Sequence, residues 1–147
     1  IKGVNPIYSI PDTPPFGKYL IGLSAIIFQN ENIVLLIFAV LSLILMYLIG
    51  IQLFHSTTWA LVPPALVSSE HIFQNQLIYT PLYDMFQLVF LLLAFLFFNK
   101  ALSTRRYIFY FLLANGALGL FISTKFFATG LTILTAGVIV LVLHRIS

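Results

Sequence analysis

Carboxylates are scarce in this chain, and their positions suggest a common site. Only four acidic residues occur among 147, namely Asp12, Glu31, Glu70 and Asp84. Glu70 and Asp84 fall within or next to long apolar runs, where a charged side chain in a membrane-spanning helix costs about 2.5–3.5 kcal/mol at mid-depth. An ionisable residue in such a place is a candidate for a binding or catalytic site.

Asp84 lies in "TPLYDMFQLVF", near the start of an apolar run. It is either a functional group or a carboxylate that stays hydrated at the headgroups and complements a helix N-terminus. Glu70 and His71 could suggest a metal site, but adjacent helical residues point to different faces. Polar packing between helices is the favoured interpretation of this pair, and we predict no metal site.

Two lysines could face a phosphate group. Lys18 follows the proline-rich stretch "TPPFG", with Asp12 on its other side, and Lys125 follows "GALGLFIST". A lysine at a membrane surface can simply extend its ammonium toward water. The alternative is that a stiff loop above the membrane presents a cation to an anionic headgroup.

Composition identifies the solvent that surrounds the fold. Hydrophobic residues make up 61% of the chain and charged residues 7%, against about 25% charged residues in an ordinary soluble domain. The chain contains no cysteine, no glycine-rich phosphate loop and no nucleophile elbow. We therefore predict a membrane protein, and the sequence gives no support to nucleotide chemistry or nucleic-acid binding.

The apolar runs predict one transmembrane domain over residues 1–147, an all-α multi-pass bundle. Proline-rich residues 1–16 predict a loop, and "GKYLIGLSAIIF" is too short to cross a bilayer and predicts an interfacial helix. Residues 1–32 thus form an external loop and an interfacial helix. The five expected spanning helices are 33–54, 57–77, 82–99, 107–123 and 126–143.

Basic residues predict the orientation of the bundle. Lys100, Arg105 and Arg106 share one short loop, and Arg145 follows the last expected span. Because loops rich in Lys and Arg stay in the cytoplasm, loop 100–106 is expected to be cytoplasmic and residues 1–32 external or luminal. All four carboxylates then lie toward the external face, as an outward-facing polar site requires.

Three stretches, in order, resemble the GT-C type of membrane glycosyltransferase, such as protein O-mannosyltransferases and the lipid A aminoarabinose transferase. These stretches are "DTPPFGKYLIGL", "WALVPPALVSSEHIFQNQLIYTPLYDMFQLVFLLLAFLFF" and "LLANGALGLFISTKFFATGLTIL". The resemblance implies sugar transfer from a polyprenyl-phosphate donor on the external or luminal face. It also implies an N-proximal fragment whose catalytic acid lies upstream of residue 1, with Asp12 as the substitute within the chain.

The resemblance further implies roles for the polar residues. Lys18 and Lys125 would contact the donor phosphate, while Asp84 and Glu70 would shape the outer polar cavity. We expect no cofactor within the chain, and a divalent metal stays open for the full enzyme. The expected partners are membrane lipid, the polyprenyl-phosphate sugar and other helices of the same or a partner protein.

Two other functions remain open from the sequence. A non-catalytic multi-pass subunit of a larger membrane complex would use small residues for helix contacts, at Gly116, Gly119, Gly130 and Gly137. A transporter segment could be built on the helix break at Pro63 and Pro64.

Overall fold

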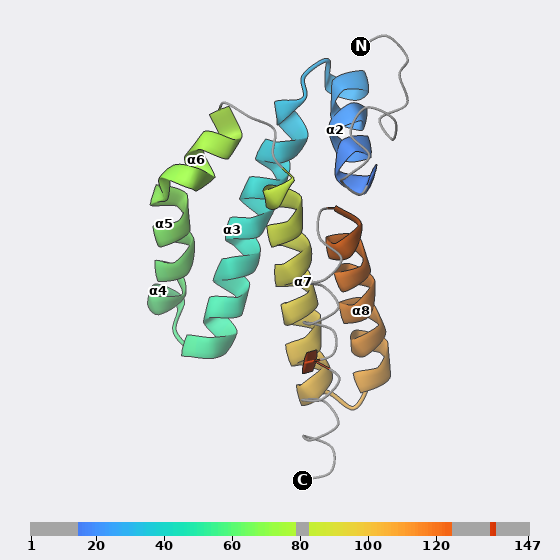
Figure 1. Cartoon of the computed structure of the whole chain (residues 1–147). Coiled ribbons are helices and arrows are strands. Elements are labelled where there is room, and N and C mark those ends of the chain that lie inside the picture. The colour runs from blue at the N-terminus through green and yellow to red at the C-terminus, as the bar shows by residue number, and fades with distance from the viewer. Residues whose placement is uncertain (1–14, 79–82, 125–135, 138–147) are drawn as a thin grey trace.

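The chain forms a bundle of helices, seen in a computed structural model (Figure 1). The structure describes residues 15–78, 83–124 and 136–137. Asp12, Lys125 and the expected span 126–143, apart from residues 136–137, lie outside the described residues. Within them the structure is helical and has no strand, which confirms the predicted all-α class.

Three helices in the described part are long and apolar enough to cross a membrane. They are α3 (Asn32–Phe54), α7 (Asp84–Ser103) and α8 (Tyr107–Thr124). At about 1.5 Å per residue, the 23 residues of α3 extend roughly 35 Å, which exceeds a hydrocarbon core of about 30 Å. The three occupy the expected ranges 33–54, 82–99 and 107–123, and α7 extends four residues beyond its expected end.

The range 57–77 differs from the single spanning helix that we expected. It forms three short helices, α4 (Thr57–Ala60), α5 (Val62–Ser69) and α6 (His71–Ile78). Prolines lack an N–H and are tolerated only in a first helical turn, so a helix restarts just before Pro63 and Pro64. Glu70 has extended backbone with ψ 128°, which ends α5. The three helices follow one another along α3, and α4 and α5 lie on the side away from α7 and α8 (Figure 1).

The short helix α2 (Pro15–Phe28) precedes α3 and runs beside its first turns in the opposite direction (Figure 1). A hydroxyl fixes the corner between them. The Ser24 Oγ donates to the carbonyl of Asn30 at 2.7 Å and accepts from the N–H of Val34 at 3.2 Å. An apolar helix of this length matches the expected short helix, and its interfacial position stays a prediction.

The core lies where α3, α6, α7 and α8 meet. Its buried members are apolar residues that pack in one cluster: Leu35, Ala39, Phe73, Met85, Phe86, Phe90 and Phe121. The Phe38 ring packs edge-on against Phe86 at 4.8 Å and against Phe90 at 5.8 Å between centroids. Lipid tails are as apolar as these side chains, so close packing rather than exclusion of water holds the helices together.

Two further contacts hold the C-terminal part of α3 against its neighbouring helices. The Asn99 amide on α7 donates to the Gln52 amide oxygen on α3 at 2.9 Å. Gly50 of α3 lies against Ala60 of α4, where an added Cβ would come within 3.0 Å of backbone atoms. Any larger side chain at residue 50 would push against the Ala60 backbone, because the two backbones approach so closely.

We expect Gly50→Ala to destabilise the protein by about 1–3 kcal/mol, because the added methyl group forces α3 and α4 apart. The measurement is thermal unfolding in detergent. Gly116→Ala is the matched control, since an added Cβ there meets nothing within 4 Å and alanine favours helix. Equal melting temperatures for the two variants would contradict the close contact.

Candidate functional site

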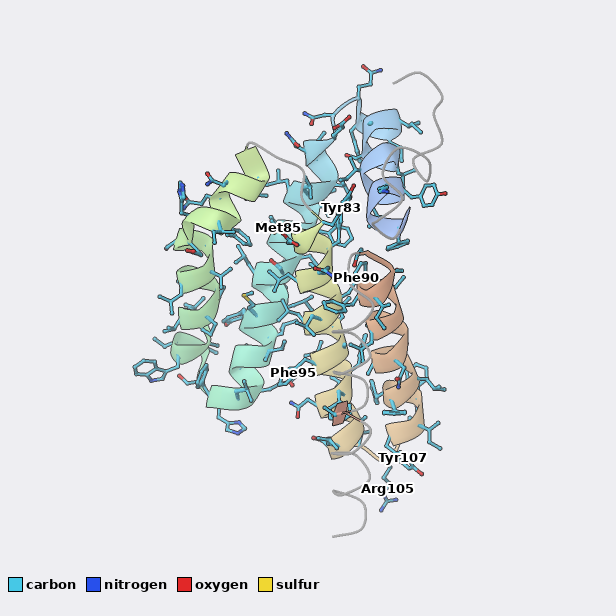
Figure 2. All side chains as sticks on the ribbon, in the orientation of Figure 1. Tyr83, Met85, Phe90, Phe95, Arg105 and Tyr107 are labelled. Atoms are coloured by element: carbon cyan, nitrogen blue, oxygen red, sulfur yellow. The ribbon has the colours of Figure 1, made fainter. Side chains whose placement is uncertain are left out.

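Several helix ends gather at one end of the bundle and bring the candidate polar residues with them. The start of α2, the start of α7 and the end of α8 lie at the same end (Figure 1). Tyr83 and Met85 mark this end of α7 in Figure 2, while Arg105 and Tyr107 lie at the other end of the molecule. Lys18, Glu70 and Asp84 therefore share the end opposite the basic loop.

Lys18 is buried, with only 8% of its surface exposed. Its neighbours in sequence hold it in place. The Phe16 ring packs against Phe90 of α7 at 5.9 Å between centroids. Gly17 lies on the Tyr83 ring so closely that an added Cβ would be 2.5 Å from Cδ1. The absence of a side chain at residue 17 thus lets the start of α2 reach α7 and carries the lysine inward.

Glu70 and Asp84 line one hollow of about 310 Å³. The remaining lining comes from apolar side chains of α6 and α7: Ile72, Phe73, Met85 and Leu88. Asp84 begins α7, where a carboxylate complements the partial positive charge of the helix N-terminus. The break at Glu70 allows α6 to turn toward α7. Residues 14 positions apart in the sequence are therefore brought to the same hollow.

Lys18 does not line that hollow. Residues three or four apart are neighbours on a helix surface, so Tyr83, which meets Gly17, lies beside Gln87, and Gln87 lies beside Asp84. Asp84 and Leu88 line the hollow. Gly17, next to the buried lysine, and the two carboxylates therefore lie by the start of α7.

Sequence reasoning missed Tyr83 and Gln87. Tyr83 immediately precedes α7, and burial raises the pKa of its phenol above the ordinary value near 10. Any tyrosine is neutral at physiological pH, and this phenol can donate a hydrogen bond. The Gln87 Nε2 is buried and has no hydrogen-bond partner in the described structure. An amide three positions after Asp84, in an otherwise apolar run, was the signal available in the sequence.

The remaining predicted residues are placed only in part. Asp12 and Lys125 lie outside the described residues. Thr124, which precedes Lys125, is fully buried at the end of α8, and its hydroxyl bonds back to the Phe121 carbonyl at 2.5 Å. His71 is exposed, and the described residues contain no group of three potential metal ligands. The divalent metal that the sequence left open for the full enzyme stays a prediction.

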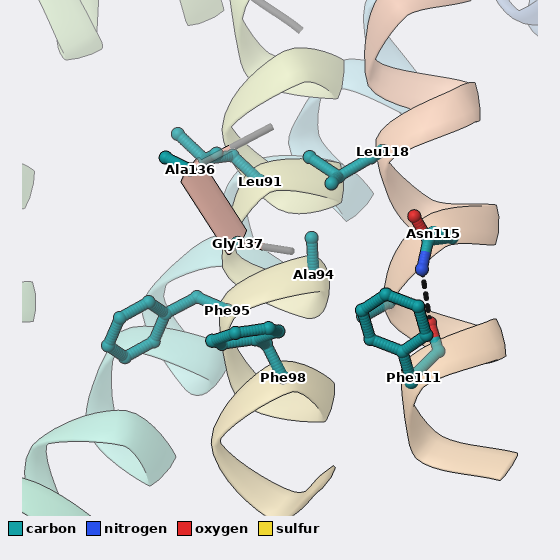
Figure 3. Close-up of a pocket in the computed structure, with 10 residues that line it drawn as sticks. Leu91, Ala94, Phe95, Phe98, Phe111, Asn115, Leu118, Ala136 and Gly137 are labelled. Carbon is teal, nitrogen blue, oxygen red and sulfur yellow. Dashed lines mark hydrogen bonds between the residues drawn. The ribbon is translucent and has the colours of Figure 1, made fainter. Parts of the chain in front are cut away.

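A separate hollow of about 250 Å³ lies between α7 and α8, away from the carboxylates (Figure 3). Apolar side chains from both helices surround it, among them Phe98, Phe111 and Leu118, with Ala136 and Gly137 beside them. The Asn115 amide at its wall donates to the Phe111 carbonyl of its own helix at 2.7 Å. Its described lining can contact hydrocarbon and includes no ionisable side chain.

The comparison with known families decides the class. A family profile described as dolichyl-phosphate-mannose-protein mannosyltransferase matches residues 12–147, which is nearly the whole chain. The chain belongs to this mannosyltransferase family. No curated protein and no solved structure matches the chain. Its apolar helices and its family together make it an integral membrane protein of the GT-C type of glycosyltransferase.

In this mannosyltransferase-family chain, Gly17→Ala should expose Lys18, because the added methyl group overlaps the Tyr83 ring and moves the start of α2. The measurement is the rate at which an amine-reactive reagent labels each lysine, read by mass spectrometry. In the unchanged protein Lys18 should react much more slowly than the exposed Lys100.

Gly22→Ala is the control within the same helix, since a Cβ there meets nothing within 4 Å. It should leave the slow labelling of Lys18 unchanged. If Lys18 reacts as fast as Lys100 in the unchanged protein, the buried position described above is wrong.

Proposed function

We propose that this chain forms the donor-binding part of an enzyme that transfers a sugar from a polyprenyl-phosphate carrier on the non-cytoplasmic face of a membrane. The observation that supports it is a buried lysine and a hollow lined by two carboxylates at the same end of the bundle. Family membership supports a membrane glycosyltransferase, and the donor, the face and the residue roles are our proposal.

Lys18 would bind the phosphate of the donor. Charge interactions strengthen when water is excluded, so a buried ammonium stabilises a phosphate more than an exposed one does. Phosphate is the leaving group when the bond between the sugar C1 and the phosphate oxygen breaks, and a cation at this position stabilises the charge that develops there. The contacts of Phe16 with Phe90 and of Gly17 with Tyr83 fix the position of the helix turn that carries the lysine. Lys125, which follows the buried end of α8, would be the second cation.

Glu70 and Asp84 would accept hydrogen bonds from sugar or acceptor hydroxyl groups in their hollow. Gln87 supports a ligand close by, because its buried Nε2 has no hydrogen-bond partner in the described structure and a buried unpaired donor is costly. Tyr83 offers a neutral phenol on the same helix face. The general base that removes the proton from the acceptor hydroxyl is not assigned to any described residue, and Asp12 remains the substitute within the chain.

Replacing the proposed phosphate ligand should reduce sugar transfer strongly. We expect Lys18→Gln in the full-length protein to lower kcat/KM for the lipid-linked sugar about 100-fold, the usual effect of removing one group that stabilises transition-state charge. Asp84→Asn should lower it about tenfold or more. The measurement is transfer from a radiolabelled polyprenyl-phosphate sugar.

Matched controls remove the same charges elsewhere. Lys100→Gln lies at the opposite end of α7, and Glu31→Gln lies at the corner between α2 and α3, outside the hollow. Both should stay within about twofold of the unchanged enzyme. Full activity of Lys18→Gln and Asp84→Asn would remove both residues from the site and the proposal with them.

Sidedness has an independent test, because the chain has no cysteine. Asn30→Cys at the corner between α2 and α3 and Ser103→Cys at the end of α7 both introduce an exposed thiol. In intact cells, a membrane-impermeant maleimide should label position 30 and leave position 103 unlabelled until the membrane is opened. The reverse result would place the carboxylates on the cytoplasmic face.

One observation favours a non-catalytic subunit as the second candidate. Gly116 and Gly119 of α8 face open space, and an added Cβ at either meets nothing within 4 Å. Such a small-residue surface lets another helix approach closely. Sugar transfer by the purified full-length protein alone would exclude a purely structural role.

A further inference from the structure

The basic end of the molecule has a surface that the proposed transfer reaction does not use. We propose that residues 104–106 and the first turns of α8 bind one anionic phospholipid, with its phosphate on Arg105 and Arg106 and an acyl chain along α8. This site lies at the end of the molecule opposite Tyr83, which contacts Gly17 beside Lys18 (Figure 2). It does not depend on the proposed function.

The position of the two arginines in the bilayer follows from the helices on either side. The spanning helix α7 ends at Ser103, and the spanning helix α8 begins at Tyr107. So short a connection between two spanning helices keeps Arg105 and Arg106 at the membrane surface. Both side chains are exposed, so their guanidinium groups lie within reach of lipid phosphates.

The surface below the arginines is hollowed and apolar. A hollow of about 510 Å³ is lined by Arg105, Arg106, Tyr107, Ile108, Phe109 and Leu112. Of these, Ile108, Phe109 and Leu112 are 58%, 58% and 64% exposed, respectively. Leu112 follows Arg106 by six residues, or roughly 9 Å along the helix, so the apolar wall begins within about two turns of the guanidinium groups. Charge above hydrocarbon is the pattern that a phospholipid presents.

Charge complementarity favours an anionic lipid over a zwitterionic one. The described carboxylates, Glu31, Glu70 and Asp84, all lie toward the other end of the bundle (Figure 1). The nearby Lys100 has its ammonium 5.7 Å from the Tyr110 ring centroid and does not line the hollow. Guanidinium groups bind phosphate oxygens in pairs, which an ammonium cannot do.

Of the segment that follows α8, the described residues Ala136 and Gly137 line the hollow between α7 and α8 and not the hollow below the arginines. These two residues therefore leave the proposed lipid surface open.

The test is native mass spectrometry of the purified full-length protein with phosphatidylglycerol or phosphatidylcholine of the same acyl chains. We expect a clear preference for phosphatidylglycerol. Each basic residue near a membrane surface contributes about fivefold to anionic-lipid affinity, so Arg106→Gln should weaken phosphatidylglycerol binding about fivefold and the Arg105→Gln, Arg106→Gln double variant about 25-fold.

Lys100→Gln is the matched control, because it removes one positive charge at the same end of the molecule without touching the hollow. It should change binding by less than twofold. Leu112→Asn keeps both arginines and should still weaken phosphatidylglycerol binding, which tests the acyl wall if the double variant does not fold. Melting temperatures in lipid-free detergent show which variants are folded.

Three results would overturn the proposal. The unchanged protein could bind the two lipids equally, or Lys100→Gln could weaken phosphatidylglycerol binding as much as Arg106→Gln, which would indicate net charge alone. Inorganic phosphate at the lipid concentration could also displace phosphatidylglycerol, and the surface would then be a simple anion site. None of these three results would contradict the proposed sugar transfer, since none of the altered residues lies at the Lys18 end.

Discussion

A bilayer leaves almost no place for charge along a spanning helix, and this constraint arranges the ionisable side chains of the protein. Those in the described structure lie at or near the ends of α2, α3, α5, α6, α7 and α8. One end collects the carboxylates and the buried lysine, and the other collects the exposed Lys100, Arg105 and Arg106. The division of the molecule into two chemically different ends follows from where the helices begin and end.

Close approach between helix backbones then determines which residues meet at each end. Lipid provides no hydrophobic driving force between helices, so small residues and interhelical hydrogen bonds decide where helices touch. At one end Gly50 meets Ala60 and Asn99 bonds Gln52, which fixes α3 against its neighbours. At the other end Gly17 brings α2 onto Tyr83. A lysine next to that glycine is buried because the backbone is close, not because its own side chain favours burial.

Local sequence predicted most of the helices but not the contacts between them. The ranges of α3, α7 and α8 could be predicted because apolar runs of sufficient length must be helical in lipid, where each backbone group needs an internal partner. The same rule overestimated 57–77, since apolar composition there outweighed the break at Pro63 and the extended Glu70. Hydropathy reports the length and average composition of a span, whereas the break depends on the backbone conformation of single residues.

The candidate site could likewise be predicted in part: the end of the bundle at which its residues lie, but not the contacts between them. That Glu70, Asp84 and Lys18 share one end followed from counting the spans between them, which remains correct although the span 57–77 is broken. The contact of Gly17 with Tyr83 and the unpaired amide of Gln87 could not be predicted, because they depend on which faces of α2 and α7 meet. The two amides of α7 show the difference: Asn99 uses its donor to join α3, whereas Gln87, three helical turns earlier, has a buried donor without a partner in the described structure. Because such a donor is costly when buried, its position beside Tyr83 favours a bound polar group at this end, and none is needed at the end where Asn99 is satisfied.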